Sequence, residues 1–332
     1  MKTILIAGGA GFIGSHLCDS LLNAGHRIIC ADKLVMEDKN IRHLLGNPNF
    51  TFINAELANQ SQVNAIFSDA EKKGNPIDAV YHLAANSDIQ KGGREPSIDF
   101  NDTLMTTRTL LEGMRVHGVN NLFFASTSAV YGEKVDELLT ETTGDLRPVS
   151  YYGGCKLASE SLISSYCSMA DVNAVVFRFP NVIGPRLTHG VIYDFIRKLR
   201  NNPGELEILG DGTQCKPYIY VADLVGAIVA LTQHFLTAQS DAEEKDQQGN
   251  EEIYNLSVEG GGTTVTRIAD IIVEEMDLED VTYHYTGGDR GWKGDVPRFE
   301  YDISKVLSTG WKPKHTSDEA VRQSVRDALG KA

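Results

Sequence analysis

Basic residues are scarce in this chain of 332 residues. Lysine and arginine number 31 against 45 aspartates and glutamates, which gives a formal net charge of −14. Nucleic acids and anionic membrane surfaces attract proteins through basic faces. We therefore expect neither as a partner, and an anionic substrate would need a local cluster of arginine and lysine.

Cysteine is also sparse, and long apolar runs are absent. The five cysteines are odd in number, scattered and without the spacing of a metal site, a pattern typical of a reducing compartment. No apolar run reaches the length of about 18 residues that crosses a membrane. The chain enters its first predicted strand almost at once, so we expect no signal peptide. These features predict a cytoplasmic protein without a metal.

Apolar strand patterns alternate with helical patterns over the first part of the chain. Short apolar runs that suit buried parallel strands lie at residues 4–6, 50–53, 78–83, 119–125 and 172–179. One long helical stretch is expected over 96–117. The alternation predicts an α/β fold with a Rossmann-type, doubly wound parallel sheet.

Beyond Pro180 the pattern loosens. Helices are expected at 191–201, 222–236, 265–276 and 317–329, strands near 206–209 and 253–256, and an exposed acidic loop at 238–252. The length favours a main domain with a smaller lobe. We therefore predict a dinucleotide-binding Rossmann domain over 1–179, to which a segment around 213–236 returns. Residues 180–332 should form mainly a smaller α/β substrate-binding lobe.

A glycine-rich turn joins the first predicted strand to the first helix, which opens with Phe12 and Ile13. Gly8, Gly11 and Gly14 fit a dinucleotide-binding loop, in which a side chain would stop the backbone from approaching a pyrophosphate. Asp32 ends the next predicted strand, near the spacing at which a carboxylate binds the adenosine ribose and repels a 2′-phosphate. The sequence therefore predicts NAD, in preference to NADP, as the cofactor.

Further cofactor contacts are expected at the carboxyl ends of the strands, where ligands bind in a doubly wound sheet. These candidates are Lys33 after the second strand, Glu56 and Leu57 after the third, and Leu83, Ala84 and Ala85 after the fourth. Contacts with the cofactor are also expected from Phe12 and Ile13 at the start of the first helix, and from Tyr152 and Lys156. Glu56 and Leu57 are equally consistent with a solvated acid beside a core leucine. His82, inside the fourth strand, is interpreted as a core histidine in preference to a catalytic one.

Tyr152 and Lys156 are four residues apart on a predicted helix and therefore share one face. A tyrosine with its ordinary pKa near 10 is a poor base, and a pKa of about 7 requires roughly 4 kcal/mol of preferential stabilisation of the phenolate. A neighbouring ammonium and the positive nicotinamide of NAD⁺ can supply it. Tyr152 would then take a proton from a substrate hydroxyl, to whose oxygen Thr127 would hydrogen-bond.

Taken together, these segments resemble the extended short-chain dehydrogenase/reductase family of NAD-dependent epimerases and dehydratases. The resemblance covers essentially the whole chain and is carried by Gly8 to Gly14, His82 to Ala85, 126–132, Tyr152 with Lys156, and Asn181 to Arg186. Within the family the sequence is most similar to UDP-galactose (UDP-glucose) 4-epimerases. That similarity implies a hydride removed from C4 of the sugar, a 4-keto intermediate, and return of the hydride to the opposite face.

The resemblance also implies residue roles. Catalysis falls on Thr127, Tyr152 and Lys156, and substrate contacts fall on Ser126, Thr127, Asn181, Lys216 and Arg290, the last two serving the diphosphate. Related sequences usually carry arginine at position 216, and lysine cannot make the bidentate phosphate contact. Cys155 replaces a more common serine. These two departures concern substrate binding and leave the catalytic core intact.

Several alternatives remain open. Dehydratases of the family carry an Asp-Glu pair directly after the catalytic threonine, and Ser128-Ala129 stands there instead, which disfavours dehydration. An epimerase of UDP-glucuronate or of a UDP-N-acetylhexosamine, a nucleotide-sugar 4-keto reductase, and a non-catalytic dinucleotide-sensing protein are the other candidates. Relatives imply a homodimer that pairs the helices near 100–117 and 152–169.

Overall fold

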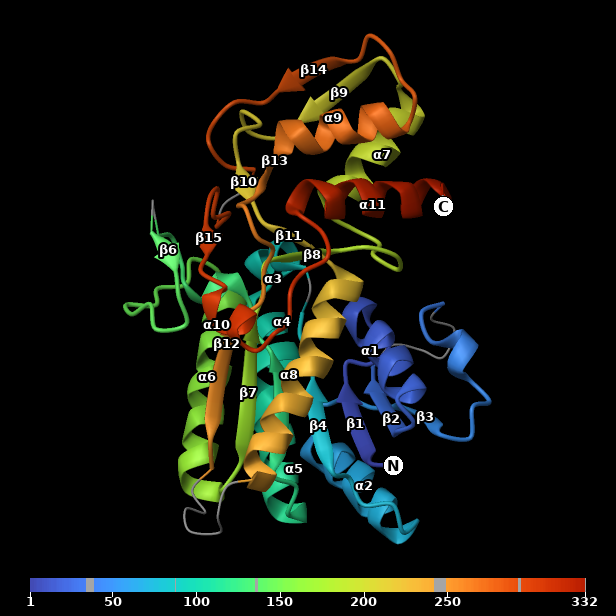
Figure 1. The fold of residues 1–332 in the computed structure, drawn as a ribbon, viewed down its shortest axis with the longest axis vertical. Coiled ribbons are helices and arrows are strands. Elements are labelled where there is room, and N and C mark those ends of the chain that lie inside the picture. The colour runs from blue at the N-terminus through green and yellow to red at the C-terminus, as the bar shows by residue number, and fades with distance from the viewer. Residues whose placement is uncertain (34–38, 87, 135–136, 242–248, 292–293, 332) are drawn as a thin grey trace. The chain divides into compact units, whose positions relative to one another are not determined.

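The structure is a computed structural model that describes residues 1–33, 39–86, 88–134, 137–241, 249–291 and 294–331 (Figure 1). The chain divides into two compact units. Unit 1 comprises residues 1–130, 150–178 and 228–254, and unit 2 comprises 131–149, 179–227 and 255–332. This division differs from the predicted boundary in two places. The loop 131–149 belongs to unit 2, and the returning segment begins at 228 and continues to 254.

The first difference has a clear cause in the contacts of the loop. The hydroxyl of Tyr131 donates to Oδ1 of Asn255 at 2.6 Å, and both residues belong to unit 2. Two residues of the loop, Leu138–Leu139, also pair with the strand Glu300–Tyr301 of the same unit. These long-range contacts attach the loop to unit 2 and were not visible in local sequence patterns.

Unit 1 is built on a seven-stranded sheet in the order β12-β7-β5-β4-β1-β2-β3. Its strands are β1 Thr3–Ala7, β2 Arg27–Asp32, β3 Phe50–Asn54, β4 Ala79–His82, β5 Asn121–Ala125, β7 Asn173–Arg178 and β12 Glu251–Asn255. The pairings from β3 to β7 are parallel. The chain order reverses between β1 and β4, so this is the doubly wound, Rossmann-type sheet that the sequence predicted. The strand expected near 253–256 is β12, and it joins this sheet.

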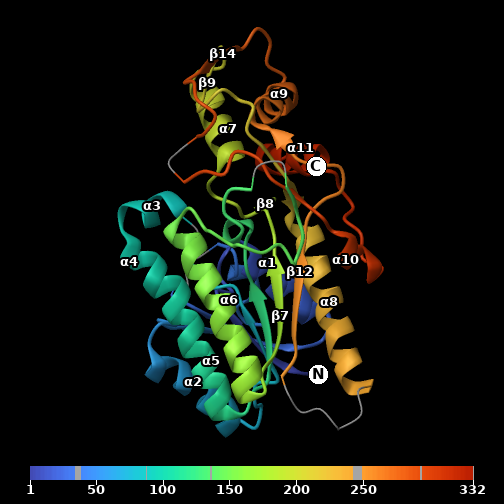
Figure 2. The same cartoon turned by 90° about the vertical axis from the view of Figure 1, so that its left-hand side faces the viewer.

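Helices cover both faces of the sheet in unit 1. On one face pack α2 Gln60–Lys72, α5 Thr106–His117 and α6 Tyr151–Ala170, and on the other α1 Phe12–Asn23 and the later part of α8 Val221–Asp241 (Figure 1, Figure 2). The core beneath the first three helices includes Phe67, Leu110 and Ile163. Short segments complete the unit: η1 Arg42–Leu44, α3 Ile89–Arg94, α4 Pro96–Asp99, the π-helical turn η2 Phe100–Met105 and η3 Ser128–Val130.

The helix expected over 96–117 is therefore divided into α4, η2 and α5. The hydroxyl of Thr106, the first residue of α5, donates to the carbonyl oxygen of Asn101 in η2 at 3.1 Å, five residues back, which matches the wider π-helical turn. A buried threonine side chain thus takes part in the local backbone pattern, which hydrophobic periodicity alone does not reveal.

The helix α8 continues beyond its predicted end at residue 236 and takes in the start of the expected loop 238–252, of which 242–248 lie outside the described residues. By length and composition Val221–Gln239 is apolar enough to cross a membrane, with a mean hydropathy of 1.5, but half of it is buried inside the protein. Phe235 packs edge-on against Phe123 of β5, with 6.4 Å between ring centroids. We therefore interpret α8 as a core helix.

Among the described residues of unit 2, strands occur only in pairs. They are β6 Leu138–Leu139 with β15 Glu300–Tyr301, β8 Asn181–Ile183 with β11 Tyr218–Tyr220, β9 Glu205–Ile208 with β14 Thr282–Tyr285, and β10 Cys215–Lys216 with β13 Thr263–Thr264. The helices are α7 Val191–Asn201, α9 Val265–Glu275, α10 Ser304–Ser308 and α11 Ser317–Leu329. A core that includes Phe195, Ile268 and Val321 lies among α7, α9 and α11. These three helices and β9 lie within one residue of their predicted positions.

Candidate active site

The glycine loop connects β1 to α1 in unit 1. Gly8 adopts a left-handed φ of +80°, and a Cβ atom there would lie 2.7 Å from the Cα atom of Ala84. A Cβ atom on Gly14 would lie 2.8 Å from the Cα atom of Gly9. The loop therefore has room for backbone only. It leads into the first amides of α1, which lack helical partners and have no acidic side chain in the first turn.

Asp32 ends β2 beside this loop. Its carboxylate is buried, and Oδ2 accepts a hydrogen bond from the backbone N–H of Ala10 at 3.1 Å. This bond holds the glycine loop against the strand, and the negative charge at the same place disfavours a 2′-phosphate. A cradle that admits only glycine, together with a carboxylate at the ribose position, fits NAD.

The other predicted cofactor contacts lie at strand ends or at the start of α1. Lys33 is half-exposed, and its Nζ lies 2.6 Å from Oδ2 of Asp102. Glu56 is exposed, whereas the side chain of Leu57 is buried in the core of unit 1. The rest are all partly buried: Phe12, Ile13, Leu83, Ala84 and Ala85. Which of these residues contact NAD stays a prediction.

Strand β5 and helix α6 bring Thr127, Tyr152 and Lys156 together. Thr127 follows the end of β5, and its side chain is hydrogen-bonded to Tyr152. The side chain of Ser150 caps α6, which places Tyr152 in the first turn. Nζ of Lys156 lies 6.0 Å from the centroid of the Tyr152 ring and donates to the carbonyl oxygen of Ala125 at 2.6 Å. The three predicted catalytic residues therefore form one cluster within unit 1.

Burial changes the pKa values of both ionisable members of the cluster. It raises the pKa of Tyr152 to about 12 and lowers the pKa of Lys156 to about 7. Lys156 does not offset the effect of burial on Tyr152 in the protein by itself, and the lowering of the Tyr152 pKa by Lys156 and NAD⁺ together stays a prediction. The reason is that desolvation disfavours the phenolate and the ammonium alike. Tyr152 needs additional positive charge beside it before it can act as a base near neutral pH.

His82 lies in the sheet beneath this cluster. It is 1% exposed, and its Nε2 lies 2.9 Å from Oγ1 of Thr107, which in turn donates to the carbonyl oxygen of Thr103. Burial lowers the pKa of His82 well below its ordinary value, so the ring is neutral. These contacts support the interpretation of His82 as a core residue.

Ser126 occupies a different environment from the one expected of a substrate contact. It is 1% exposed, and its hydroxyl donates to Oε1 of Glu160. Glu160 is also paired with Arg178, whose Nη2 lies 2.7 Å from Oε2. Sequence analysis missed both charged residues. Two signals were available: Glu160 lies one helical turn after Lys156, and Arg178 ends an otherwise apolar strand. A substrate contact by Ser126 stays a prediction.

The remaining predicted substrate contacts lie in unit 2. Asn181 begins β8 and is exposed. The ammonium of Lys216 pairs with the carboxylate of Asp295, and Nη1 of Arg290 donates to the backbone oxygen of the same residue at 3.2 Å. Nη2 of Arg290 also lies 2.5 Å from Oε1 of Glu133. Unit 2 thus gathers the two expected diphosphate-binding cations around the buried Asp295, which sequence analysis missed.

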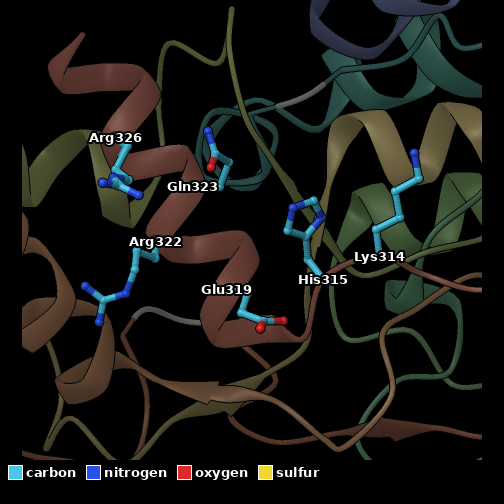
Figure 3. A pocket seen from close by; sticks show the side chains of 6 residues that line it. All are labelled: Lys314, His315, Glu319, Arg322, Gln323 and Arg326. Atoms are coloured by element: carbon cyan, nitrogen blue, oxygen red, sulfur yellow. The ribbon is translucent and has the colours of Figure 1, made fainter. Parts of the chain in front are cut away.

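A separate hollow of about 250 Å³ lies beside α11 in unit 2 (Figure 3). It is lined by Lys314, His315, Glu319, Arg322, Gln323 and Arg326. Arg322 and Arg326 both pair with Glu275, and His315 pairs with Asp223. Most of its cations are therefore already matched by carboxylates, and none of the predicted site residues lines it.

Unit 1 combines a glycine loop and an adjacent aspartate with a tyrosine and a lysine on a helix beside a threonine. This combination defines a dinucleotide-dependent enzyme of the short-chain dehydrogenase/reductase class. The sequence profile of the NAD dependent epimerase/dehydratase family matches residues 4–256. The chain belongs to this family, and NAD is its cofactor.

Individual relatives match over the whole chain. The chain is 31% identical over 330 residues, 97% of each sequence, to a putative UDP-glucose 4-epimerase of Methanocaldococcus jannaschii. The structure of the Thermus thermophilus UDP-glucose 4-epimerase in complex with NAD superimposes with a TM-score of 0.81, at 29% identity and 100% coverage of both chains. The UDP-glucuronic acid 4-epimerase of Bacillus cereus, in complex with UDP-glucuronic acid and NAD, gives 0.83 at 26% identity and the same coverage. These similarities confirm the predicted family and fold.

Proposed function

We propose that this protein is an NAD-dependent UDP-glucose/UDP-galactose 4-epimerase. The observation that carries the proposal is the cluster of Thr127, Tyr152 and Lys156 with Ser128 and Ala129 directly after the threonine. Those two residues offer neither an acid nor a base for eliminating water, so the cluster suits proton and hydride transfer at one carbon. The relatives that act on UDP-glucose support the choice of sugar.

In the proposed reaction Tyr152 accepts the proton of the C4 hydroxyl and later returns it, while Thr127 holds the same oxygen by a hydrogen bond. NAD supplies, when bound, the hydride acceptor and a positive charge beside the tyrosine, and it is regenerated in each turnover. The sugar, in its 4-keto form, must turn over in the site before the hydride returns to the opposite face of C4 and the proton returns to the oxygen. Lys216 and Arg290 would hold the diphosphate by exchanging carboxylate partners for phosphate oxygens.

The test is to incubate the purified protein with UDP-galactose deuterated at C4, without added cofactor, and to follow UDP-glucose by NMR. We expect conversion with the deuterium retained at C4, because the same hydride returns to the same carbon. Tyr152→Phe, carrying the same amount of bound NAD, is the matched control and should not convert the sugar. Reduction of a 4-keto nucleotide sugar by added NAD(P)H, without conversion of UDP-galactose, would instead indicate a reductase.

Absence of conversion by protein that holds NAD would overturn the choice of sugar. UDP-glucuronate and UDP-N-acetylglucosamine are then the next substrates, the first because of the Bacillus cereus neighbour. If none of these sugars reacts and Tyr152→Phe changes no measurable property, the protein is a dinucleotide sensor and the catalytic assignment is wrong.

A homodimer in the cytoplasm is the quaternary structure and location that we propose. Large apolar side chains are exposed on the helices expected to pair: Phe100, Met105, Val116 and Met169 are 52%, 37%, 54% and 86% exposed. Helices α5 and α6 lie side by side on one face of unit 1 (Figure 2). Light scattering should give twice the chain mass, and a monomer would reject the proposal.

A further inference from the structure

A buried chain of polar side chains lies beside the tyrosine and lysine in unit 1. Ser126 donates to Glu160, and Arg178 binds both oxygens of that carboxylate, Nε to Oε1 at 3.1 Å and Nη2 to Oε2 at 2.7 Å. We propose that Glu160 and Arg178 are positioning residues. Through Ser126 they hold the backbone that carries Thr127, and their paired charges set the electrostatic surroundings of Lys156.

The mechanical part of this proposal follows from the position of Ser126. The residue before it, Ala125, accepts the hydrogen bond of Lys156, and the residue after it is Thr127. The backbone N–H of Ser126 donates to the carbonyl oxygen of Phe177 at 2.8 Å, one residue before Arg178 on β7. Both the amide and the side chain of Ser126 are therefore fixed. A shift of Glu160 would move the oxygen that holds Lys156 and the hydroxyl that contacts Tyr152.

The electrostatic part follows from the spacing on α6. Glu160 lies one turn after Lys156, and its carboxylate favours the ammonium form of the lysine against the effect of burial. An unpaired buried carboxylate would be costly, and the bidentate contact with Arg178 offsets that cost. The pair thus presents balanced charges next to the lysine.

Other ionisable groups act on the same region from the elements packed around it. They are Tyr152 and Cys155 on α6, His82 on β4, Asp99 on α4 and Glu251 on β12. His82 is neutral, and Glu251 is influenced by both members of the Glu160–Arg178 pair. Changing one member of the pair therefore changes the net charge beside Lys156 without removing a group that contacts the sugar in the proposed reaction.

The test separates an effect of Glu160 and Arg178 on the position and charge of the cluster from a role of these residues in folding alone. It rests on the proposed function only where turnover is measured. Glu160→Gln keeps an acceptor for Ser126 but leaves the charge of Arg178 uncompensated. We expect the pH profile of kcat to move toward lower pH by about one unit, because extra positive charge favours the phenolate and the neutral lysine. Arg178→Gln should move it in the opposite direction, and the double variant should return it near the unmodified position.

Two further variants isolate the mechanical link. Ser126→Ala should lower kcat by about 10-fold without moving the pH profile, because the charges remain while the backbone segment loses its side-chain anchor. Arg178→Lys keeps the charge with fewer hydrogen bonds and should behave in the same way. If Arg178→Gln does not fold, Glu160→Gln and Arg178→Lys still give a shifted and an unshifted profile.

The matched control is Glu112→Gln, at a partly buried glutamate outside the catalytic cluster whose Oε1 lies 2.7 Å from Nη2 of Arg115 on α5. It should leave the profile unchanged. The ultraviolet absorbance of the Tyr152 phenolate gives a readout without turnover. Each variant is titrated with and without the additional change Tyr152→Phe, and the difference between the two titrations is the signal of Tyr152. If the wild-type protein converts no sugar, the proposed function fails while this titration still decides the present proposal. Equal activity losses with no shift, or shifts in one direction only, would overturn it.

Discussion

The two units hold their functional charges in contrasting ways. In unit 1 Lys156, Glu160 and Arg178 are 2%, 6% and 3% exposed, and their partners are a backbone carbonyl, a serine and each other. In unit 2 the side chains of Lys216 and Arg290 are 14% and 36% exposed, and each is paired with a carboxylate. Desolvation lowers the pKa of Lys156 in the first set, whereas Lys216 and Arg290 in the second set keep part of their side chains in contact with water.

This difference matches the two tasks of the proposed reaction. Proton transfer requires groups whose pKa values depart from their ordinary range, and burial next to fixed charges and hydrogen-bond partners produces such departures. Binding a diphosphate requires cations that can change partner as the substrate arrives and leaves. Substitutions in unit 1 should therefore act on kcat and on pH dependence, and those in unit 2 should act on KM.

Tyr152→Phe should produce the largest effect. Removal of the phenolic oxygen deletes the acid/base group, so we expect kcat to fall by about 10³-fold or more, with bound NAD unchanged. Tyr166→Phe on the same helix is the matched control, because its hydroxyl lies 3.3 Å from Oε2 of Glu112 and outside the catalytic cluster. Steady-state kinetics and the absorbance of released NAD measure both quantities. Retention of more than a tenth of the activity would remove Tyr152 from its assigned role.

Lys216→Ala tests the role assigned to unit 2. Loss of a charged hydrogen bond to the diphosphate should raise KM by about 10-fold and leave kcat nearly unchanged. Lys216→Arg should lower KM below that of the unmodified protein, because arginine can bind phosphate with two parallel hydrogen bonds. The control is Lys198→Ala, where a half-buried lysine of the same unit pairs with Asp194. A fall in kcat with unchanged KM would contradict the contrast between the units.

Asp32→Asn tests cofactor selection in unit 1. The amide oxygen can still accept from Ala10, while the charge that disfavours a 2′-phosphate is removed. We expect the ratio of NADP to NAD affinity to rise by about 10-fold, measured by calorimetry after removal of bound nucleotide. Asp32→Ala should weaken both nucleotides, since it also releases the loop. Tighter binding of NADP than of NAD by the unmodified protein would overturn the assignment.

The sequence predicted those site residues whose positions follow from their own strand or helix. The glycine turn, Asp32, and the pair of Tyr152 and Lys156 follow from strand and helix periodicity, which fixes where side chains point within one element. Thr127 was placed because it follows an apolar strand in a parallel sheet. In each of these cases a single strand, turn or helix determines where the side chain lies.

The missed residues have partners far away in the sequence. Ser126 and Glu160 are 34 positions apart, Glu160 and Arg178 are 18 apart, and Lys216 and Asp295 are 79 apart. Such pairs form only when separate elements pack together, and no local pattern marks them. The same reason explains the loop 131–149, which contacts of Tyr131 with Asn255 attach to unit 2.

Lys156→Met tests whether the buried charge of unit 1 costs stability, and its effect should be the smallest. Burial lowers the pKa of Lys156 from 10.5 to about 7. Between these values the unfolded chain binds more protons than the folded one, so stability rises with pH. The buried lysine lowers the free energy of unfolding by its full amount below a pH of about 7, and it has no such effect above the pKa of the unfolded chain. Methionine keeps the apolar stem, and we expect it to raise the free energy of unfolding at neutral pH by about 1–2 kcal/mol.

Urea unfolding of both proteins, freed of nucleotide, measures this difference across the range from about pH 7 to pH 10. The unmodified protein should gain stability as pH rises, the variant should show a flatter profile, and the two curves should converge at the alkaline end. Lys198→Met, at a lysine that pairs with Asp194 near the surface of unit 2, should change little at any pH. A Lys156→Met protein that is less stable at neutral pH would mean that the folded state compensates the ammonium fully. The contrast between buried and exposed cations would then rest on geometry and not on desolvation.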